Sequence, residues 1–259
     1  TTMKILTGYI MEYEGNVLYN ENDIRDCIEE YRSKIGYLPE NNPLYHEMYV
    51  REYLEYISGI YKLGGSVNSL VDEVIQKTGL TREYKKKIAS LSKGYRQRVG
   101  LASTLIHNPE ILILDEPTTG LDPNQIVEIR NLIADFGKEK TILLSTHILQ
   151  EVEAICDRVI IIDKGKIVAQ DKTNEIATNK QSQTVIVEFL KDAIEEEVSM
   201  IEGVSHCKKV SDKKFIIESY QEYDIRENIF NFAVSKGNVV LLMSKQEQKL
   251  EDVFRELTK

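Results

Sequence analysis

Two adjacent carboxylates that follow a short apolar run are the residues of this chain best suited to chemistry. Residues Ile111 to Leu114 are all aliphatic, and Asp115 and Glu116 come directly after them. A continuous apolar run predicts a buried parallel strand, and open α/β sheets bind ligands at the carboxyl ends of such strands. There Asp115 would support a magnesium ion, and Glu116 would polarise an attacking water. Apolar strands that end in Asp-Glu also occur by chance.

A group suited to phosphate lies earlier in the chain, where Ser92 and Gly94 open a predicted helix. The start of a helix offers backbone N–H groups and the positive end of the helix dipole, and serine adds a hydroxyl. Serine and glycine also favour helix starts for purely local reasons. On these residues alone, a phosphate contact and an ordinary helix cap therefore both stay open.

A histidine follows the next predicted strand after the carboxylates. Residues 141–145 form another apolar run, and Thr146 and His147 come at its end. Parallel strands end at a common edge, so we expect the imidazole of His147 at the same edge as Glu116. The turn at Leu121-Asp122-Pro123 lies between the two strands. A lone histidine at a strand end is usually structural, and its place in this order of elements is what favours a functional role.

The elements that must position these residues alternate between strands and helices, which predicts a layered α/β domain. The stretch from Tyr49 to about Asn108 has apolar residues at helical spacing and predicts a mostly helical subdomain inserted between strands. The remaining expected strands are 16–19, 34–39 and 158–163, the last a continuous run like the central strands, and the expected helices are 1–6, 124–136 and 148–156.

Beyond a polar stretch at 178–183, taken as a linker, the pattern changes to that of a small α+β domain resembling a ferredoxin-like unit. We therefore predict an α/β domain over residues 1–180, with its helical subdomain at about 41–108, and an accessory domain over 181–259. The expected order of the second domain is strand 184–190, helix 191–201, strands 204–210 and 213–219, helix 224–236, strand 238–244 and helix 249–258.

Composition excludes several classes of function. The chain has 259 residues, of which 42% are hydrophobic and 29% charged, as in ordinary globular proteins. A net charge of −9 argues against a general nucleic-acid binder, because a phosphate backbone would repel it. The apolar runs are strand-sized and far short of a membrane span. Three widely spaced cysteines favour a reducing compartment, and hence a cytoplasmic location.

Taken together, four segments resemble the signature motif, Walker B, D-loop and H-switch of ABC ATPases in order and spacing. The likeness extends over residues 1 to about 175, and Tyr37-Leu38-Pro39-Glu40 falls where that family has its Q-loop. Residues 37–45 look most like the gliding-motility-associated, ABC-2-type exporter ATPases, and residues 250–254 resemble the tail of many such subunits. The four segments are Leu91 to Arg98, Ile111 to Pro117, Thr119 to Asp122 and Ser145 to His147.

The resemblance implies a P-loop NTPase-type ABC ATPase core and a function as the ATP-hydrolysing subunit of an exporter. It implies ATP and Mg²⁺ as ligands, with Asp115 and Glu40 facing the metal. Glu116 would be the general base, and His147 would contact the γ-phosphate and help to position the water. Thr1 would touch the α-phosphate.

The resemblance also implies an assembly. Ser92 and Gly94 would contact the γ-phosphate of an ATP bound to the opposite subunit, so that a homodimer sandwiches two nucleotides, and Asp122 would help to link the two sites. The expected partner is an integral membrane permease, with no nucleic acid. The expected location is cytoplasmic, peripheral on the inner face of the cell membrane.

The chain departs from the family pattern at several positions. Glu40 stands for the usual Gln, and Lys93 and Tyr95 stand for a Gly and a Gln of the signature. The glycine-rich phosphate loop would precede Thr1, so we expect residues 1–259 alone to show no ATPase activity. Two alternatives stay open: a truncated or regulatory ABC module that does not hydrolyse ATP, and a soluble ABC protein unconnected with transport.

Overall fold

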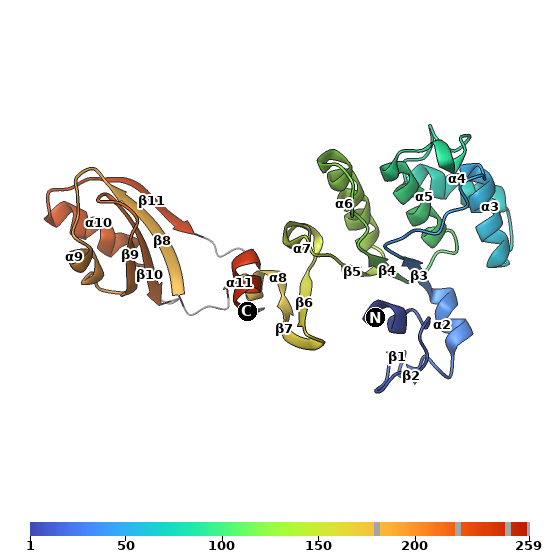
Figure 1. Cartoon of the computed structure of the whole chain (residues 1–259), viewed down its shortest axis with the longest axis horizontal. Helices are drawn as coiled ribbons and strands as arrows, with labels where there is room; N and C mark the ends of the chain where they lie inside the picture. Colours follow the sequence, from blue (N-terminus) through green and yellow to red (C-terminus); the bar gives the residue numbers. More distant parts are fainter. Residues whose placement is uncertain (179–181, 221–223, 247–249, 258–259) are drawn as a thin grey trace. The chain divides into compact units, whose positions relative to one another are not determined.

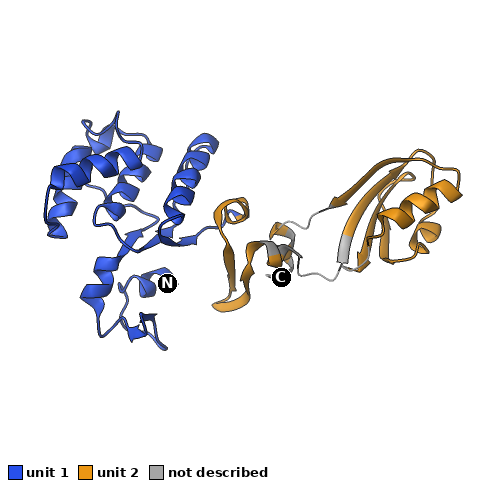
Figure 2. Ribbon diagram, turned by 180° about the vertical axis from the view of Figure 1, so that it is seen from behind, with its two compact units in different colours: residues 1–148 blue, residues 149–259 orange. Residues whose placement is uncertain are grey.

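The computed structural model describes residues 1–178, 182–220, 224–246 and 250–257 (Figure 1). The chain forms two compact units, residues 1–148 and residues 149–259, which Figure 2 colours separately. The predicted domain boundary at 180/181 lies within the second unit and stays a prediction. The linker predicted at 178–183 falls partly on residues 179–181, which lie outside the described part of the chain.

A three-stranded parallel sheet is the centre of the first unit, in the order β3-β4-β5. Leu38 pairs with Leu114 and Leu114 pairs with Leu144, so the strands run in register to a common edge. Leu112, Ile113 and Leu114 are buried, as the continuous apolar run predicts. The strands are β3 (Ile35–Leu38), β4 (Ile111–Asp115) and β5 (Thr141–Ser145).

Helices surround this sheet in the first unit. Helix α5 packs against β3 and against α3, α4 and α6, while α6 also packs on β5. The stretch predicted as a helical subdomain contains α3, α4, a short 3₁₀ turn at Ile88–Ser90 and α5. The bounds are α3 (Val50–Ile60), α4 (Val67–Lys77), α5 (Lys93–Leu105) and α6 (Pro123–Gly137).

The N-terminal segment has a small core of its own, formed by Ile24, Tyr31 and Ile35. Tyr31 also donates its hydroxyl hydrogen to the carbonyl oxygen of Leu6 at 2.6 Å, which ties the first helix to the second. The first helix agrees with the helix predicted for residues 1–6. The elements are α1 (Thr2–Leu6), the two-residue strands β1 (Leu18–Tyr19) and β2 (Asn22–Asp23), and α2 (Ile28–Lys34).

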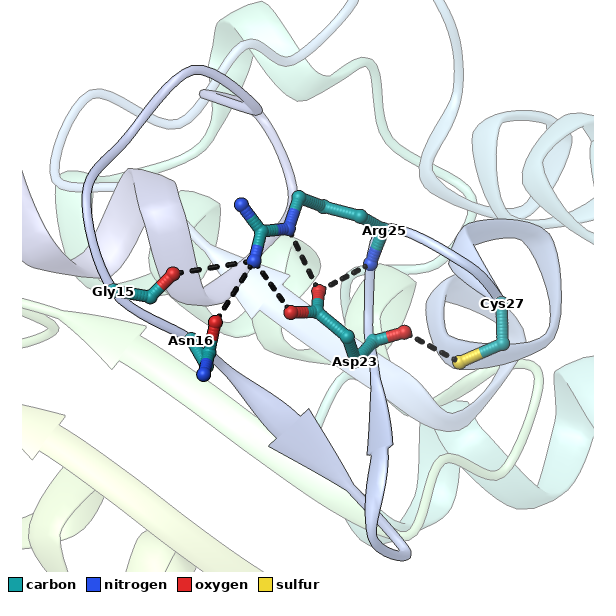
Figure 3. Close-up of polar contacts among 5 residues, drawn as sticks. All are labelled: Gly15, Asn16, Asp23, Arg25 and Cys27. Atoms are coloured by element: carbon teal, nitrogen blue, oxygen red, sulfur yellow. Dashed lines mark hydrogen bonds and ion pairs between the residues drawn. The ribbon is translucent and has the colours of Figure 1, made fainter.

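Strands β1 and β2 pair as an antiparallel hairpin, and Arg25 fixes the loop that precedes it (Figure 3). Its guanidinium forms a fork with Asp23, with Nε 2.9 Å from Oδ1 and Nη2 2.6 Å from Oδ2. Nη2 also donates to the carbonyl oxygen of Gly15 at 3.2 Å and to Oδ1 of Asn16 at 3.1 Å, and the Cys27 thiol donates to the Asp23 carbonyl. The fork also lowers the pKa of the Asp23 carboxyl. A bidentate network of this kind orders strands of two residues that pair weakly by themselves.

The second unit begins with an antiparallel strand pair flanked by short helices. The sequence predicts residues 158–163 as a continuous-run strand of the layered domain, whereas in the described residues β6 pairs only with β7. Lys164 and Gly165, both at positive φ, form the turn between them. The bounds are α7 (Leu149–Ile155), β6 (Arg158–Asp163), β7 (Lys166–Lys172) and α8 (Thr173–Thr178).

The remainder of the second unit is a four-stranded antiparallel sheet in the order β11-β8-β10-β9. One face carries Phe189, Phe215 and Ile217, which pack with Ile229 and Ala233 of α10. The βαββαβ order and this strand order are those of the predicted ferredoxin-like unit. Its elements are β8 (Ser182–Phe189), α9 (Glu195–Ser199), β9 (Val204–Lys209), β10 (Lys214–Tyr220), α10 (Arg226–Ser235) and β11 (Val240–Gln246).

The last helix, α11 (Leu250–Leu257), packs on α7 and α8. Leu250 is fully buried and forms a cluster with Val152 and Ile176, and its backbone N–H donates to Oε1 of Glu153 at 2.8 Å. Residues at the end of the chain are thus joined to the first helices of the same unit. Over the described residues, no helix is both long and apolar enough to cross a membrane.

Candidate functional site

The backbone of Glu116 is held in an unusual conformation directly after β4. Its φ is +49°, in the left-handed region that non-glycine residues rarely adopt. Its N–H donates to the carbonyl oxygen of Ser145 at 3.1 Å and lies 3.2 Å from the Ser145 hydroxyl oxygen. Left-handed backbone costs a residue with a Cβ about 1–2 kcal/mol. The end of β5 therefore fixes the turn that aims the Glu116 side chain.

The Glu116 carboxylate receives two donors on the same oxygen. Nδ1 of His147 lies 2.8 Å from Oε2, and the Thr119 hydroxyl donates to Oε2 at 3.1 Å. The Glu116 side chain is 20% exposed and the His147 side chain 71% exposed. Because a carboxylate only accepts, the His147 ring carries its proton on Nδ1 in this pair. The arrangement orients a partly exposed carboxylate that can take a proton from water.

Asp115 lies between hydroxyl groups from both neighbouring strands. The Ser145 hydroxyl of β5 donates to Oδ1 of Asp115. On the other side, burial and then the neighbouring Asp115 carboxylate raise the pKa of the Tyr37 hydroxyl of β3. All three groups offer oxygen atoms, and Mg²⁺ is usually bound through one or two carboxylates, waters and substrate phosphates. The donor set at Asp115 therefore fits that ion.

A second group forms where α5 and α6 begin. Ser92 is the N-cap of α5, and its hydroxyl oxygen accepts from the Tyr95 N–H at 3.4 Å. Asp122 is the N-cap of α6 and accepts from the Gln125 N–H at 3.0 Å. The Gln125 side chain lies on Gly94, where a Cβ would come within 2.7 Å of its Cδ. The ordinary capping role of Ser92 is thus realised, while the residue stays exposed to solvent.

A small pocket lies between these two helices, with a volume of about 220 Å³. Arg98 of α5 and Glu128 of α6 form an ion pair of 2.6 Å at its wall, and Arg98 also donates to the carbonyl oxygen of Thr78 at 3.0 Å. These contacts hold α5 against α6 and against the end of α4. Its lining residues are Ser92, Gly94, Tyr95, Arg98, Gln125, Glu128 and Ile129.

The structure brings Asp115, Glu116 and His147 to one edge of the sheet, as the sequence predicts. Within residues 1–148, no hydrogen bond or ion pair joins Thr1 or Glu40 to these three residues. Thr1 is exposed as the N-cap of α1. Glu40 is exposed in the loop after β3. Their predicted roles at the α-phosphate and the metal therefore stay predictions. The predicted group of Ser92, Gly94 and Asp122 lies at the starts of α5 and α6.

Comparison with known proteins decides the family. The family model described as "ABC transporter" matches residues 1–119. The bacitracin transport ATP-binding protein BcrA of Bacillus licheniformis is 34% identical over 264 residues, which cover 99% of this chain and 83% of that protein. The chain belongs to the ABC transporter ATP-binding proteins. As a member of this family it is an ATP-binding subunit, and the predicted α/β ABC ATPase core is confirmed.

Further similarities agree with this family. The linearmycin resistance ATP-binding protein LnrL of Bacillus subtilis is 28% identical over 266 residues, with 100% of this chain and 85% of that protein covered. A solved ABC transporter ATP-binding subunit superposes with a TM-score of 0.60 at 29% identity, over 69% of this chain and 75% of that one. The cbiO1 protein from Clostridium perfringens, part of the ABC transporter complex cbiONQ, also superposes with a TM-score of 0.60 at 29% identity. The superposition covers 68% of this chain and 72% of that one.

Several contacts of this ABC subunit were not predicted. Thr119 and Ser145 appear in the sequence only as members of longer motifs, and nothing in their order shows which carboxylate each one contacts. The Tyr37 hydroxyl interacts with Asp115 from a neighbouring strand. This contact could have been predicted only from the parallel pairing that places Tyr37 beside Ile113. In the sequence Lys93 stands out only as a departure from the signature, whereas in the structure its side chain lies against Gly120.

Proposed function

We propose that this subunit hydrolyses ATP with Glu116 as the general base when a phosphate-binding loop completes the site. The observation that carries the proposal is the pair of donors, His147 and Thr119, on a single Glu116 oxygen. They leave Oε1 as the proton acceptor for an attacking water. A general base positioned in this way contributes about 10²–10⁴-fold to a rate. With Nδ1–H donating to Glu116, the exposed His147 ring would contact a phosphate oxygen at the same time only through a protonated Nε2, that is, as an imidazolium.

Asp115 would support Mg²⁺ at the edge of the sheet, with Glu40 as a second carboxylate, and the bound ion would neutralise charge on the phosphates. The chain's own residues hold Asp115 ready for this role. The Ser145 hydroxyl occupies Oδ1, and the Tyr37 hydroxyl stays protonated because burial and Asp115 raise its pKa. The carboxylate is thereby fixed between two strands before any ligand binds.

We further propose a homodimer in which the start of α5 faces the nucleotide of the other subunit. Ser92 is exposed, so its hydroxyl at this helix start can approach a γ-phosphate. Gly94 is buried beneath the Gln125 side chain, which would have to move aside to open the Gly94 backbone. Asp122, at the start of the adjacent α6, would link the two sites. Two-fold symmetry makes each such contact occur twice.

The partner proposed for this dimer is a separate integral membrane permease, contacted through the region around residues 40–60. The relatives named for bacitracin transport and linearmycin resistance support a transporter of the exporter type. This subtype agrees with the resemblance of residues 37–45 to gliding-motility-associated exporter ATPases. It would place the subunit in the cytoplasm, on the inner face of the membrane.

We propose that residues 1–259 alone bind ATP weakly and do not hydrolyse it. Their sequence contains no Gly-x-x-x-x-Gly-Lys-Ser/Thr segment, which in P-loop proteins cradles the phosphates with backbone N–H groups and a lysine. The test compares this polypeptide with an extended polypeptide, in which an engineered segment carrying a Gly-x-x-x-x-Gly-Lys-Thr phosphate loop precedes Thr1. Robust hydrolysis by residues 1–259 would refute this proposal without affecting the role of Glu116.

The test of Glu116 is the substitution Glu116→Gln in the extended polypeptide. Glutamine keeps the shape and accepts from Thr119 but cannot accept the proton, so we expect turnover to fall at least about 100-fold. ATP binding and ATP-dependent dimerisation should persist. Phosphate release, equilibrium binding of ATP and light scattering measure the three properties.

The matched control is Glu139→Gln, which alters an exposed glutamate just after α6. It should hydrolyse ATP at the rate of the unaltered protein. If Glu116→Gln hydrolyses ATP as fast as this control, Glu116 is not the base. If neither the unaltered protein nor the control hydrolyses ATP, a binding or regulatory module becomes the better description of the subunit.

A further inference from the structure

The side chain of Lys93 lies across the backbone of Gly120 and joins two parts of the site. A Cβ added to Gly120 would overlap the Lys93 ammonium nitrogen and would lie 3.2 Å from its Cε. Gly120 also has a φ of +72°, which favours glycine independently. The backbone conformation therefore favours glycine at 120, and a side chain at this position would also displace the end of the Lys93 side chain.

The loop that contains Gly120 is tied directly to Glu116. The Thr119 N–H donates to the Glu116 carbonyl oxygen at 3.2 Å, and the Thr119 hydroxyl donates to the Glu116 carboxylate at 3.1 Å. The Leu121 N–H donates to the Thr118 carbonyl oxygen at 3.1 Å. These bonds close a tight turn, so a shift of Gly120 moves the hydroxyl that orients Glu116.

The other end of the contact is the start of α5. Lys93 is the residue after the N-cap Ser92 and immediately precedes Gly94, on which Gln125 of α6 packs. One helical turn further, the ion pair of Arg98 with Glu128 holds α5 to α6. Lys93 is thus the member of this row of contacts that touches the Glu116 loop itself.

We propose that Lys93, through its contact with Gly120, is a positioning residue that fixes the Ser92–Gly94 helix start relative to the Glu116 carboxylate. This inference rests on the proposed hydrolytic function. It assigns a task to a lysine that departs from the signature pattern. Two elements linked by such a contact are energetically coupled, and coupling is measured with paired substitutions.

The experiment uses the extended polypeptide with Lys93→Met, Lys93→Arg, Gly120→Ala and the double variant Lys93→Met/Gly120→Ala. Methionine removes the ammonium group, and alanine at 120 displaces the lysine. We expect kcat to fall about fivefold in each single variant, with the KM for ATP within about twofold. The double variant should be no slower than either single variant, and Lys93→Arg should keep most of the rate.

Two controls separate positioning from other effects. Gly165→Ala strains a glycine at φ +77° that has no neighbour within 4 Å, and it should leave kcat unchanged. Lys85→Met removes an exposed lysine elsewhere in the helical subdomain and should also be silent. Thermal unfolding shows which variants fold. If Gly120→Ala does not fold, the comparison of Lys93→Met with Lys93→Arg still tests the proposal.

The proposal is overturned by additive effects in the double variant, by full activity of Lys93→Met, or by an equal loss in Gly165→Ala. It is also overturned if Lys93→Met raises KM alone while Gly120→Ala is silent, because Lys93 would then act on the nucleotide directly. Failure of the proposed function gives a different result: the unaltered extended protein does not hydrolyse ATP, or Glu116→Gln hydrolyses it normally.

Discussion

At the scale of single residues, Glu116 is unusual because both its backbone and its carboxylate are held by neighbours. Ser145 fixes the backbone N–H, while His147 and Thr119 converge on one carboxylate oxygen. Two hydrogen-bond donors restrict the Glu116 side chain to few conformations, so less conformational entropy is lost when the carboxylate acts on water. Removing one donor should therefore affect the rate more than the binding of ATP.

The first prediction concerns Thr119→Val, which keeps the shape of the side chain and removes its hydroxyl. A hydrogen bond to a charged group contributes about 1.5–3 kcal/mol, so we expect kcat to fall about tenfold. Thr119→Ser restores the donor and should retain most of the rate. Steady-state hydrolysis by the extended polypeptide measures both. A Thr119→Val protein as fast as the Thr119→Ser protein would show that this hydrogen bond has no part in turnover.

At the scale of elements, the connection from α5 to the sheet contains the half-buried imidazole of His107. Nε2 of His107 lies 2.8 Å from the carbonyl oxygen of Ile35, at the start of β3, so this nitrogen carries the proton. The ring stacks on Tyr61 at 3.9 Å between centroids. Nδ1 is buried and has no partner among the described residues. Burial, and then the charge of Lys140, lower the pKa of His107.

The second prediction follows from this lowered pKa. Below the unfolded value of 6.5 the unfolded chain binds a proton that the folded chain rejects. Stability from His107 is therefore present above that pH and is lost as the pH falls towards the folded pKa, by at most about 1.4 kcal/mol per pH unit. His107→Gln keeps a donor for Ile35 but does not titrate, so its unfolding free energy should fall less between pH 7 and pH 5.

Urea unfolding of residues 1–259 at several pH values measures this difference. The control is His46→Gln, which alters an exposed histidine and should keep the pH dependence of the unaltered chain. Carboxylates titrate in all three proteins and cancel in the comparison. Identical pH profiles for the His107→Gln and His46→Gln chains would mean that the imidazole of His107 is not responsible.

At the scale of the whole molecule, the chain order and the packing order differ in the second unit. Helix α11 follows the ferredoxin-like elements in sequence but packs on α7 and α8, where Leu250 is buried with Val152 and Ile176. The third prediction is that Leu250→Ala costs about 2–5 kcal/mol and acts on α7 and α8. Hydrogen exchange should quicken in those helices, while amides of β8 and β10 keep their protection.

The control for this substitution is Leu241→Ala, since Leu241 of β11 is 56% exposed. Truncation of an exposed leucine should leave exchange in α7 and α8 unchanged. Should Leu250→Ala instead release the sheet β11-β8-β10-β9 first, α11 would have to be regarded as part of the ferredoxin-like unit, and the packing described for it would not govern stability.

Much of the fold could be predicted because local patterns specify elements. The apolar run before Asp115 gave β4, and parallel pairing then placed His147 at the edge that carries Glu116. Strand partners were harder to predict. The apolar run of residues 158–163 identifies a strand but does not tell whether its neighbour is parallel or antiparallel. In the structure that neighbour is β7.

The finer contacts of the site could not be predicted, because they depend on side-chain direction and on a tight turn. The hydrogen bond of Thr119 requires the left-handed backbone of Glu116, and the contact of Lys93 with Gly120 joins residues from separate elements. Neither follows from spacing. The roles of Thr1 and Glu40 rest on resemblance alone, since both are exposed and neither takes part in the hydrogen bonds described for Asp115, Glu116 and His147.

The left-handed backbone of Glu116 has a consequence for how this subunit changes under selection. Glycine would adopt a φ of +49° without the steric cost that a Cβ incurs, so Glu116→Gly would relax the turn after β4. A screen that rewards only thermostability would favour such a replacement, whereas a screen for the proposed ATP hydrolysis would eliminate it. Opposite outcomes of the two screens at this one codon would reveal a residue kept for chemistry against the preference of the fold.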